Sequence, residues 1–251
     1  MIGLAVVFFI FGLIVGSFLN VCIYRIPLGK SIVYPPSSCP SCGVRIKWYD
    51  NIPVLSYILL KGRCRNCMER ISILYPAVEL LSGILSAAIY LKYSLTLQTA
   101  AYLLLTYALI VASFIDLKHY IIPDTISIGL IVVGIGISHF VPIGLKASIA
   151  GAVFGFVLLY IVATLGKKAF KKEAMGGGDI KLLSGIGAFI GIKGVLFTLF
   201  VASLLGSVVG IVLIAMGRSY LGARLPFGPY LSAAAITYLF CGEWVIRTLY
   251  G

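Results

Sequence analysis

Long apolar runs separated by short polar segments dominate the chain, and their lengths predict membrane-spanning helices. The first run, residues 2–23, has no Lys or Arg before it, which favours a retained helix over a signal peptide. Seven further runs follow, at 72–91, 97–115, 125–141, 146–165, 180–192, 194–216 and 227–249. A helix needs roughly 20 residues to cross a hydrocarbon core of about 30 Å. The pattern therefore predicts an all-α polytopic membrane protein of about eight transmembrane helices, in which the sixth is short and glycine-rich.

Composition narrows the class of protein further. Hydrophobic residue types make up 61% of the chain and charged types only 11%, with a mean hydropathy of +1.09. Ordinary soluble domains are roughly half apolar and a quarter charged. These values exclude a conventional soluble enzyme, a disordered regulator and a secreted disulfide module.

The basic residues indicate how the spans are oriented. With the N-terminus outside, sixteen of the twenty Lys and Arg residues fall in inner loops, and only Lys92, Lys146, Lys193 and Arg247 remain outside. Cytoplasmic loops are typically rich in Lys and Arg, so both termini are expected outside. Anionic inner-leaflet lipids then account for the net charge of +12, and no nucleic-acid partner is expected.

Four cysteines form two closely spaced pairs in the first inner loop. Cys39 and Cys42 make one C-x-x-C pair, Cys64 and Cys67 make the second, and twenty-one residues separate the pairs. Two such knuckles predict a closed tetrahedral zinc site, which leaves no open position for catalysis. Two disulfides or four free thiols are the alternatives, and a reducing compartment disfavours the disulfides.

Two aspartates occur at the inner ends of predicted spans. Asp116 ends the third span, and Asp179 begins the sixth after three glycines, Gly176, Gly177 and Gly178. Carboxylates at the same depth on different helices can meet, and a pair that shares one proton supplies a general base and a general acid, as in aspartic proteases. The glycines would let an extended peptide approach the carboxylate closely. The alternative is that Asp179 is a helix N-cap and Asp116 an interfacial anchor.

Three other carboxylates have simpler interpretations. Asp124 follows Pro123 at the start of the fourth span and is expected to be an N-cap. Asp50 lies in the hydrophilic loop and is expected to be solvated. Glu79 lies inside the second span, so it is expected either to pair with an inner-loop Arg or to belong to a site.

Several motifs in order along the chain resemble one known family. They are Gly16-Ser-Phe-Leu-Asn-Val-Cys-Ile-Tyr-Arg25, both C-x-x-C pairs, Asp50-Asn-Ile-Pro53, Tyr75-Pro-Ala-Val-Glu79, Asp116 with Ile122-Pro-Asp124, Gly176 to Asp179, and Pro226-Phe-Gly-Pro229. In these motifs the chain resembles the bacterial type IV prepilin peptidases, which act in pilus, type II secretion and competence systems. The resemblance implies that Asp116 and Asp179 are the catalytic aspartates of a membrane aspartic endopeptidase.

The resemblance also implies a second activity. Members of this family remove a basic leader from prepilins or pseudopilins after a glycine, at the cytoplasmic face of the inner membrane. They then methylate the new N-terminus with S-adenosylmethionine. Gly62, Arg63 and Glu79 are the resulting candidates for the methyltransferase site, although Gly62 and Arg63 can equally form a turn of the zinc knuckle.

The resulting division has three parts: a first helix at 1–24, a zinc-binding loop associated with methyl transfer at 25–71, and a membrane peptidase domain at 72–251. Three alternatives remain open. The first is a peptidase without methylation. The second is a proton-coupled transporter that uses its aspartates as a relay, and the third is a scaffold whose zinc loop recruits a partner. A relay predicts acidic residues at the bilayer midplane, whereas these aspartates gather at one face.

Overall fold

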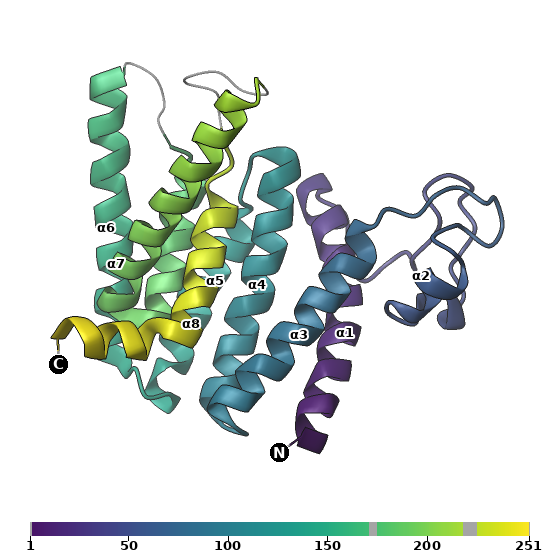
Figure 1. Cartoon of the computed structure of the whole chain (residues 1–251), viewed down its shortest axis with the longest axis horizontal. Helices are drawn as coiled ribbons and strands as arrows, with labels where there is room; N and C mark the ends of the chain where they lie inside the picture. Colours follow the sequence, from purple (N-terminus) through teal and green to yellow (C-terminus); the bar gives the residue numbers. More distant parts are fainter. Residues whose placement is uncertain (1, 171–174, 218–224, 251) are drawn as a thin grey trace. The chain divides into compact units, whose positions relative to one another are not determined.

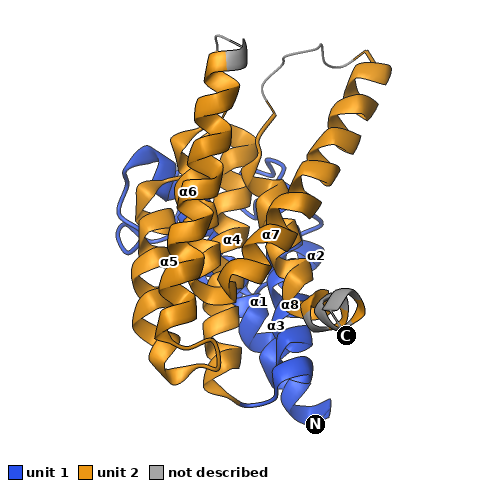
Figure 2. Ribbon diagram, turned by 90° about the vertical axis from the view of Figure 1, so that its left-hand side faces the viewer, with its two compact units in different colours: residues 1–95 blue, residues 96–251 orange. Residues whose placement is uncertain are grey.

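The computed structural model describes residues 2–170, 175–217 and 225–250. These residues form helices joined by loops, with two isolated β-bridges and no β-strand, so the predicted all-α class is confirmed. The chain divides into two compact units, Met1–Leu95 and Thr96–Gly251 (Figure 2). The second predicted span therefore groups with the first span and the cysteine loop, whereas the sequence-based division joined it to the peptidase domain.

Unit 1 contains two long helices and a loop region with short helical turns. The helices are α1 (Ile2–Arg25) and α3 (Leu74–Tyr93), with η1 (Ile26–Leu28), η2 (Trp48–Asn51) and α2 (Leu55–Leu59) between them. The two long helices lie side by side (Figure 1). Glycines on α1 allow this close contact: a Cβ atom added at Gly12 would lie 2.6 Å from the Ser82 carbonyl oxygen, and one at Gly16 would lie 2.7 Å from the Glu79 Cα atom. Small residues four apart pack membrane helices in this way.

Unit 2 is a helical bundle around one apolar core. Its elements are α4 (Leu97–His119), α5 (Asp124–Ile137), η3 (Ser138–Phe140), α6 (Leu145–Phe170), α7 (Gly177–Ala215) and α8 (Gly228–Tyr250). Leu109, Ile186 and Leu231 are fully buried in its core. Glycines again permit close helix packing, since a Cβ atom at Gly155 of α6 would lie 2.8 Å from the Leu183 carbonyl oxygen of α7.

The predicted sixth and seventh spans form the two halves of α7. Gly191 interrupts the helical backbone with φ 69° and ψ −175°, a positive φ that favours glycine. A Cβ atom at Gly187 would lie 2.8 Å from Val195 Cγ2, whereas eight residues of straight helix span about 12 Å. The chain therefore turns sharply at Gly191, and the short, glycine-rich sixth span is buried within unit 2.

The described helices have the length and composition of a membrane protein. Five of them, α1, α3, α4, α6 and α7, are long and apolar enough to cross a bilayer, and the helical stretch Asp124–Phe140 is apolar but shorter. Large apolar side chains such as Val7, Val132 and Phe200 are exposed on these helices. Lipid is the solvent that such surfaces require.

Candidate active site and metal centre

Asp116 lies in the last turn of α4 and is nearly buried, with 5% of its surface exposed. The helix ends at Tyr120, whose backbone takes the left-handed conformation (φ 56°) and whose N–H donates to the Asp116 carbonyl oxygen at 2.9 Å. The carboxylate Oδ2 atom accepts a hydrogen bond of 2.9 Å from the Gly228 N–H, at the start of α8. The helix end and the amino terminus of α8 together fix this carboxylate.

Asp179 lies in the first turn of α7 and is also nearly buried, at 9% exposed. Its N–H donates to the Gly176 carbonyl oxygen at 3.2 Å. Gly176 is the N-cap, whereas Gly177 and Gly178 are already helical, so only the first of the three glycines stays outside the helix. The Oδ1 atom of Asp179 is buried and has no hydrogen-bond partner among the described residues.

Ile122 packs between the segments that carry the two aspartates. A Cβ atom at Gly178, next to Asp179, would lie 2.9 Å from Ile122 Cβ. A Cβ atom at Gly228 would lie 3.0 Å from Ile122 Cδ1 and 2.8 Å from Asp116 Oδ2. The segments that carry Asp116 and Asp179 therefore meet at Ile122. The structure thus brings together the two aspartates singled out from the sequence, in an arrangement that suits general acid and base chemistry.

Asp124 does not join these two carboxylates by any contact seen in the structure. Its Oδ1 atom lies 2.7 Å from Lys181 Nζ, and both side chains are exposed. The prediction that Asp124 caps α5 is wrong, because Pro123 is the N-cap and Asp124 is the first helical residue. A carboxylate in that first turn still interacts favourably with the helix dipole.

The four loop cysteines form a compact cluster. The sulfur atoms of Cys39, Cys42, Cys64 and Cys67 all lie within 4.8 Å of one another, and the Cys39 and Cys67 sulfurs are 3.8 Å apart. Four zinc–sulfur bonds of about 2.3 Å define a tetrahedron with edges of about 3.8 Å. The thiols are free, so the disulfide alternative is not what the structure contains. The donor set and its spacing fit a structural metal ion.

Main-chain hydrogen bonds shape the two cysteine turns alike. The Cys39 N–H donates to the Val44 carbonyl oxygen at 3.0 Å, and the Cys64 N–H donates to the Glu69 carbonyl oxygen at 2.8 Å. In each turn a later N–H also donates to the carbonyl oxygen of the first cysteine. Gly43 N–H donates to Cys39, and Met68 N–H donates to Cys64. Both turns therefore hold their cysteine pairs through local backbone contacts.

Gly62 and Arg63 lie at the entrance to the second cysteine turn. Gly62 is buried with φ 67°, and a Cβ atom there would lie 3.0 Å from the Tyr57 hydroxyl oxygen. Its N–H donates to the Tyr57 carbonyl oxygen, and its own carbonyl accepts from Ile71 N–H, both at 2.8 Å. Arg63 is exposed and pairs by its backbone with Arg70. These contacts describe a turn, the simpler of the two interpretations made from the sequence.

Glu79 is a buried residue of α3 that contacts the loop. Its Oε2 atom accepts a hydrogen bond of 2.7 Å from the Val54 N–H, and the Ser17 side chain of α1 lies near its carboxylate. Of the two alternatives raised from the sequence, an inner-loop arginine partner is not seen: the contact from the loop is the Val54 backbone amide. Val54 has φ 62°, which is unusual for a β-branched residue. Glu79 thus holds a strained loop position against the helices of unit 1.

One loop ion pair was not expected from the sequence. The Arg65 Nε and Nη2 atoms contact the Asp50 carboxylate at 2.7–3.1 Å, and the Asp50 side chain is only 11% exposed. The hydrogen bonds from Arg65 lower the pKa of Asp50 below its ordinary value. The prediction of a solvated Asp50 is wrong. The two residues are fifteen apart in an irregular loop, so no periodic pattern could have indicated their contact.

Comparisons with known proteins assign the two halves of the chain to known domain families. Residues 10–93 match the bacterial peptidase A24 N-terminal domain, and residues 103–211 match the type IV leader peptidase family. The boundary between these matches agrees with the division between units 1 and 2.

Several named relatives are similar over most of the chain. A prepilin leader peptidase/N-methyltransferase of Myxococcus xanthus is 42% identical over 86% of this chain and 65% of that protein. Proteins of the same name from Pseudomonas aeruginosa and Neisseria gonorrhoeae are 37% and 35% identical, with 94% and 95% of this chain and 90% and 88% of those proteins covered. No solved structure matches the chain.

Proposed function

The chain belongs to the type IV leader peptidase family, and on this premise we propose that it removes the leader of type IV prepilins or pseudopilins and then methylates the new N-terminus. The observation that carries the proposal is the pair of nearly buried carboxyls, Asp116 and Asp179, at the ends of two helices of unit 2. A protein substrate with a membrane-embedded helix would present its cleavage site at the membrane depth of these helix ends.

The two carboxyls divide the work of peptide hydrolysis. One takes a proton from the attacking water, and the other donates a proton to the leaving amine, as in aspartic proteases. The hydrogen bond from Gly228 N–H to Asp116 Oδ2 stabilises that carboxylate, whereas Asp179 Oδ1 is free to contact water or the scissile carbonyl. Ile122 packs against Gly178 and Gly228, the neighbours of these two groups, and so helps to hold their segments in place.

Unit 1 supplies the parts for methyl transfer. Bound S-adenosylmethionine supplies an electrophilic methyl group that the new N-terminal amine attacks, with the carbon–sulfur bond electrons leaving on sulfur. Zinc is the metal proposed for the four cysteines, and it is structural because four sulfur ligands close the site. Glu79, Gly62 and Arg63 stay candidates for this activity, with Glu79 and Gly62 supported as residues that shape the loop.

We propose an inner-membrane location with both termini outside and the catalytic aspartates on the cytoplasmic side. The support is the distribution of Lys and Arg, which concentrates in the loops that would be cytoplasmic. In this orientation the cysteine loop lies in a reducing compartment, where thiolates are available to bind zinc.

Mass spectrometry of a purified prepilin tests both activities together. Incubation with the protein and S-adenosylmethionine should give leader removal followed by the gain of one methyl group. Asp116→Asn and Asp179→Asn should each reduce cleavage by about 10³-fold or more, and the double variant should be little worse. Near-normal cleavage in either variant contradicts the dyad. Cleavage without methylation would leave a peptidase alone.

A further inference from the structure

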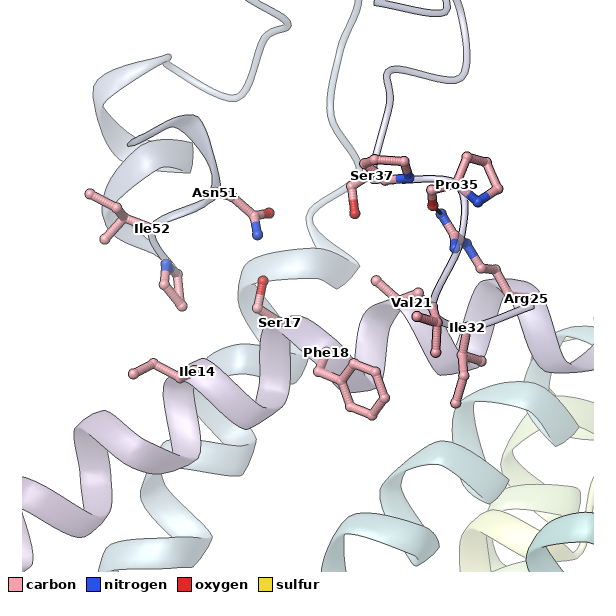
Figure 3. Close-up of a pocket in the computed structure, with 13 residues that line it drawn as sticks. Ile14, Ser17, Phe18, Val21, Arg25, Ile32, Pro35, Ser37, Asn51 and Ile52 are labelled. Atoms are coloured by element: carbon pink, nitrogen blue, oxygen red, sulfur yellow. Dashed lines mark hydrogen bonds between the residues drawn. The ribbon is translucent and has the colours of Figure 1, made fainter. Parts of the chain in front are cut away.

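Unit 1 contains a cavity of about 520 Å³ between α1 and the loop (Figure 3). Its volume falls within the range of roughly 300–1,000 Å³ that is typical of small-molecule sites. One face of α1 lines one side, through Ile14, Ser17, Phe18, Val21 and Arg25. The distance from Ile14 to Arg25 along the helix axis is about 16 Å. The loop residues 32–33, 35–37 and 51–53 line the other side.

The walls of the cavity are mostly apolar, with a few polar groups that converge. Phe18, Val21, Ile32 and Ile52 are among the apolar residues, and Phe18 contributes an aromatic ring. In Figure 3 the tips of Ser17 and Asn51 point toward each other across the cavity, and the Ser37 hydroxyl points into the same space. An apolar site with a few oriented polar groups is the usual form of a small-molecule pocket.

Arg25 provides the cationic group of the cavity. Its Nη1 atom donates to the Ser31 carbonyl oxygen at 2.9 Å, and its Nη2 atom donates to the Pro35 carbonyl oxygen at 2.7 Å. A guanidinium carries five N–H donors, so three remain for a ligand. Arg25 can therefore shape the loop wall and bind a carboxylate at the same time.

We propose that this cavity is the binding site for S-adenosylmethionine, an assignment that rests on the proposed methyl transfer. The ligand has a carboxylate for Arg25, polar adenosine atoms for the Asn51 amide and the Ser17 and Ser37 hydroxyls, and a sulfonium cation that an aromatic ring such as Phe18 attracts. The cavity also reaches into the membrane-embedded part of α1. A methyl donor at that depth can meet the N-terminal amine of a substrate whose following residues lie in the bilayer.

This assignment separates the donor site from the cysteine turns. Gly62 and Arg63 do not line the cavity. Glu79 acts through its neighbours, because its carboxylate holds Val54, which follows the cavity residue Pro53, and it lies near Ser17. Glu79 is thus a positioning residue for one wall.

Binding of S-adenosylhomocysteine to the full-length protein in detergent tests the site without prepilin. Titration calorimetry gives the dissociation constant for the parent and for two variants. Val21→Trp fills the cavity from α1 and should weaken binding more than 100-fold, and Asn51→Ala removes one amide and should weaken it about tenfold. Val7→Trp is the matched control, since Val7 is an exposed residue of α1 outside the cavity.

Hydrogen exchange provides a second readout. Ligand binding should slow amide exchange in residues 31–37 and 51–54 of the parent and of Val7→Trp, but not of Val21→Trp. Zinc content and melting temperature identify any variant that has lost its fold. If Val21→Trp has lost its fold, the comparison with the parent rests on Asn51→Ala.

The outcomes distinguish a failure of the cavity assignment from a failure of the proposed function. If the parent binds the ligand and both cavity variants bind it equally well, the donor site lies elsewhere and the proposed function stands. If the parent binds no ligand, both the cavity assignment and the methyl-transfer part of the proposed function fail. If the variants change only the binding of added phosphatidylglycerol, the cavity is a lipid site and the assignment is overturned.

Discussion

The candidate sites of the two units are built by opposite means. In unit 2 the aspartates come from helix ends far apart in the sequence, and packing around Ile122 and Gly228 buries both. In unit 1 the cysteines come from two tight turns in an exposed loop, and each turn is held by its own backbone hydrogen bonds. The first site depends on helix packing, whereas the second would depend on the proposed metal to join its two turns. Changes to metal and changes to packing should therefore affect different activities.

Loss of one cysteine should have a large effect that is confined to unit 1. Cys64→Ser leaves three sulfur ligands, so zinc affinity should fall by more than about tenfold, and the loop should become sensitive to proteolysis. Methylation should be lost while leader cleavage continues. Zinc analysis, limited proteolysis and prepilin mass spectrometry measure the three effects.

Cys241→Ser is the control for this change, because Cys241 is a free cysteine of α8 outside the cluster. It should retain zinc and both activities. Full zinc occupancy in Cys64→Ser would contradict a four-cysteine site. Equal loss of cleavage and methylation would show that the metal supports both units.

A methyl group at Gly178 should affect unit 2 selectively. In Gly178→Ala the new Cβ atom would lie 2.9 Å from Ile122 Cβ, so Ile122 or the start of α7 must move. Overpacking of this kind costs about 1–3 kcal/mol, and displacement of Asp179 should reduce cleavage by roughly 10–100-fold. The assay is prepilin cleavage, with zinc content as a measure of the integrity of unit 1.

The adjacent Gly177→Ala is the matched control, since a Cβ atom there would meet no atom within 4 Å. Alanine also favours the helix that begins at this residue, so cleavage and thermal stability should stay close to those of the parent. Equal losses in both variants would mean that this segment needs glycine for flexibility rather than for close packing.

The sequence predicted features that follow from local composition or from the chemistry of rare residues. Long apolar runs predicted the helices, the spacing of the cysteines predicted their cluster, and Asp116 and Asp179 stood out because few acidic residues occur at span ends. The contact between Glu79 and Val54, and the pairing of Asp50 with Arg65, depend on how an irregular loop folds back on itself. Neither contact has a periodic signal, and so neither could be predicted.

The Asp50–Arg65 pair should have the smallest effect, because its Arg65 side chain is 58% exposed and water therefore screens the pair. The pKa of Asp50 is lowered in the folded loop by the hydrogen bonds from Arg65. Its contribution to stability is therefore fully present above the ordinary aspartate pKa of about 3.9 and is lost as the pH falls through the lowered folded value. At pH 7, Asp50→Asn should speed hydrogen exchange in residues 47–51 by a factor of about two to five, the range for ion pairs that water still reaches.

The difference between Asp50→Asn and the parent should shrink as the pH falls below about 4, since protonation of Asp50 removes the same ion pair from the parent. Acid also protonates zinc-bound thiolates, but this loss is common to both proteins and cancels in the comparison. Glu69→Gln is the control, because Glu69 is an exposed carboxylate of the same loop that accepts from Cys64 through its main chain. A difference that persists at low pH would mean that Asp50 acts through its shape rather than its charge, and equal acceleration in Glu69→Gln would indicate a general effect of loop charge.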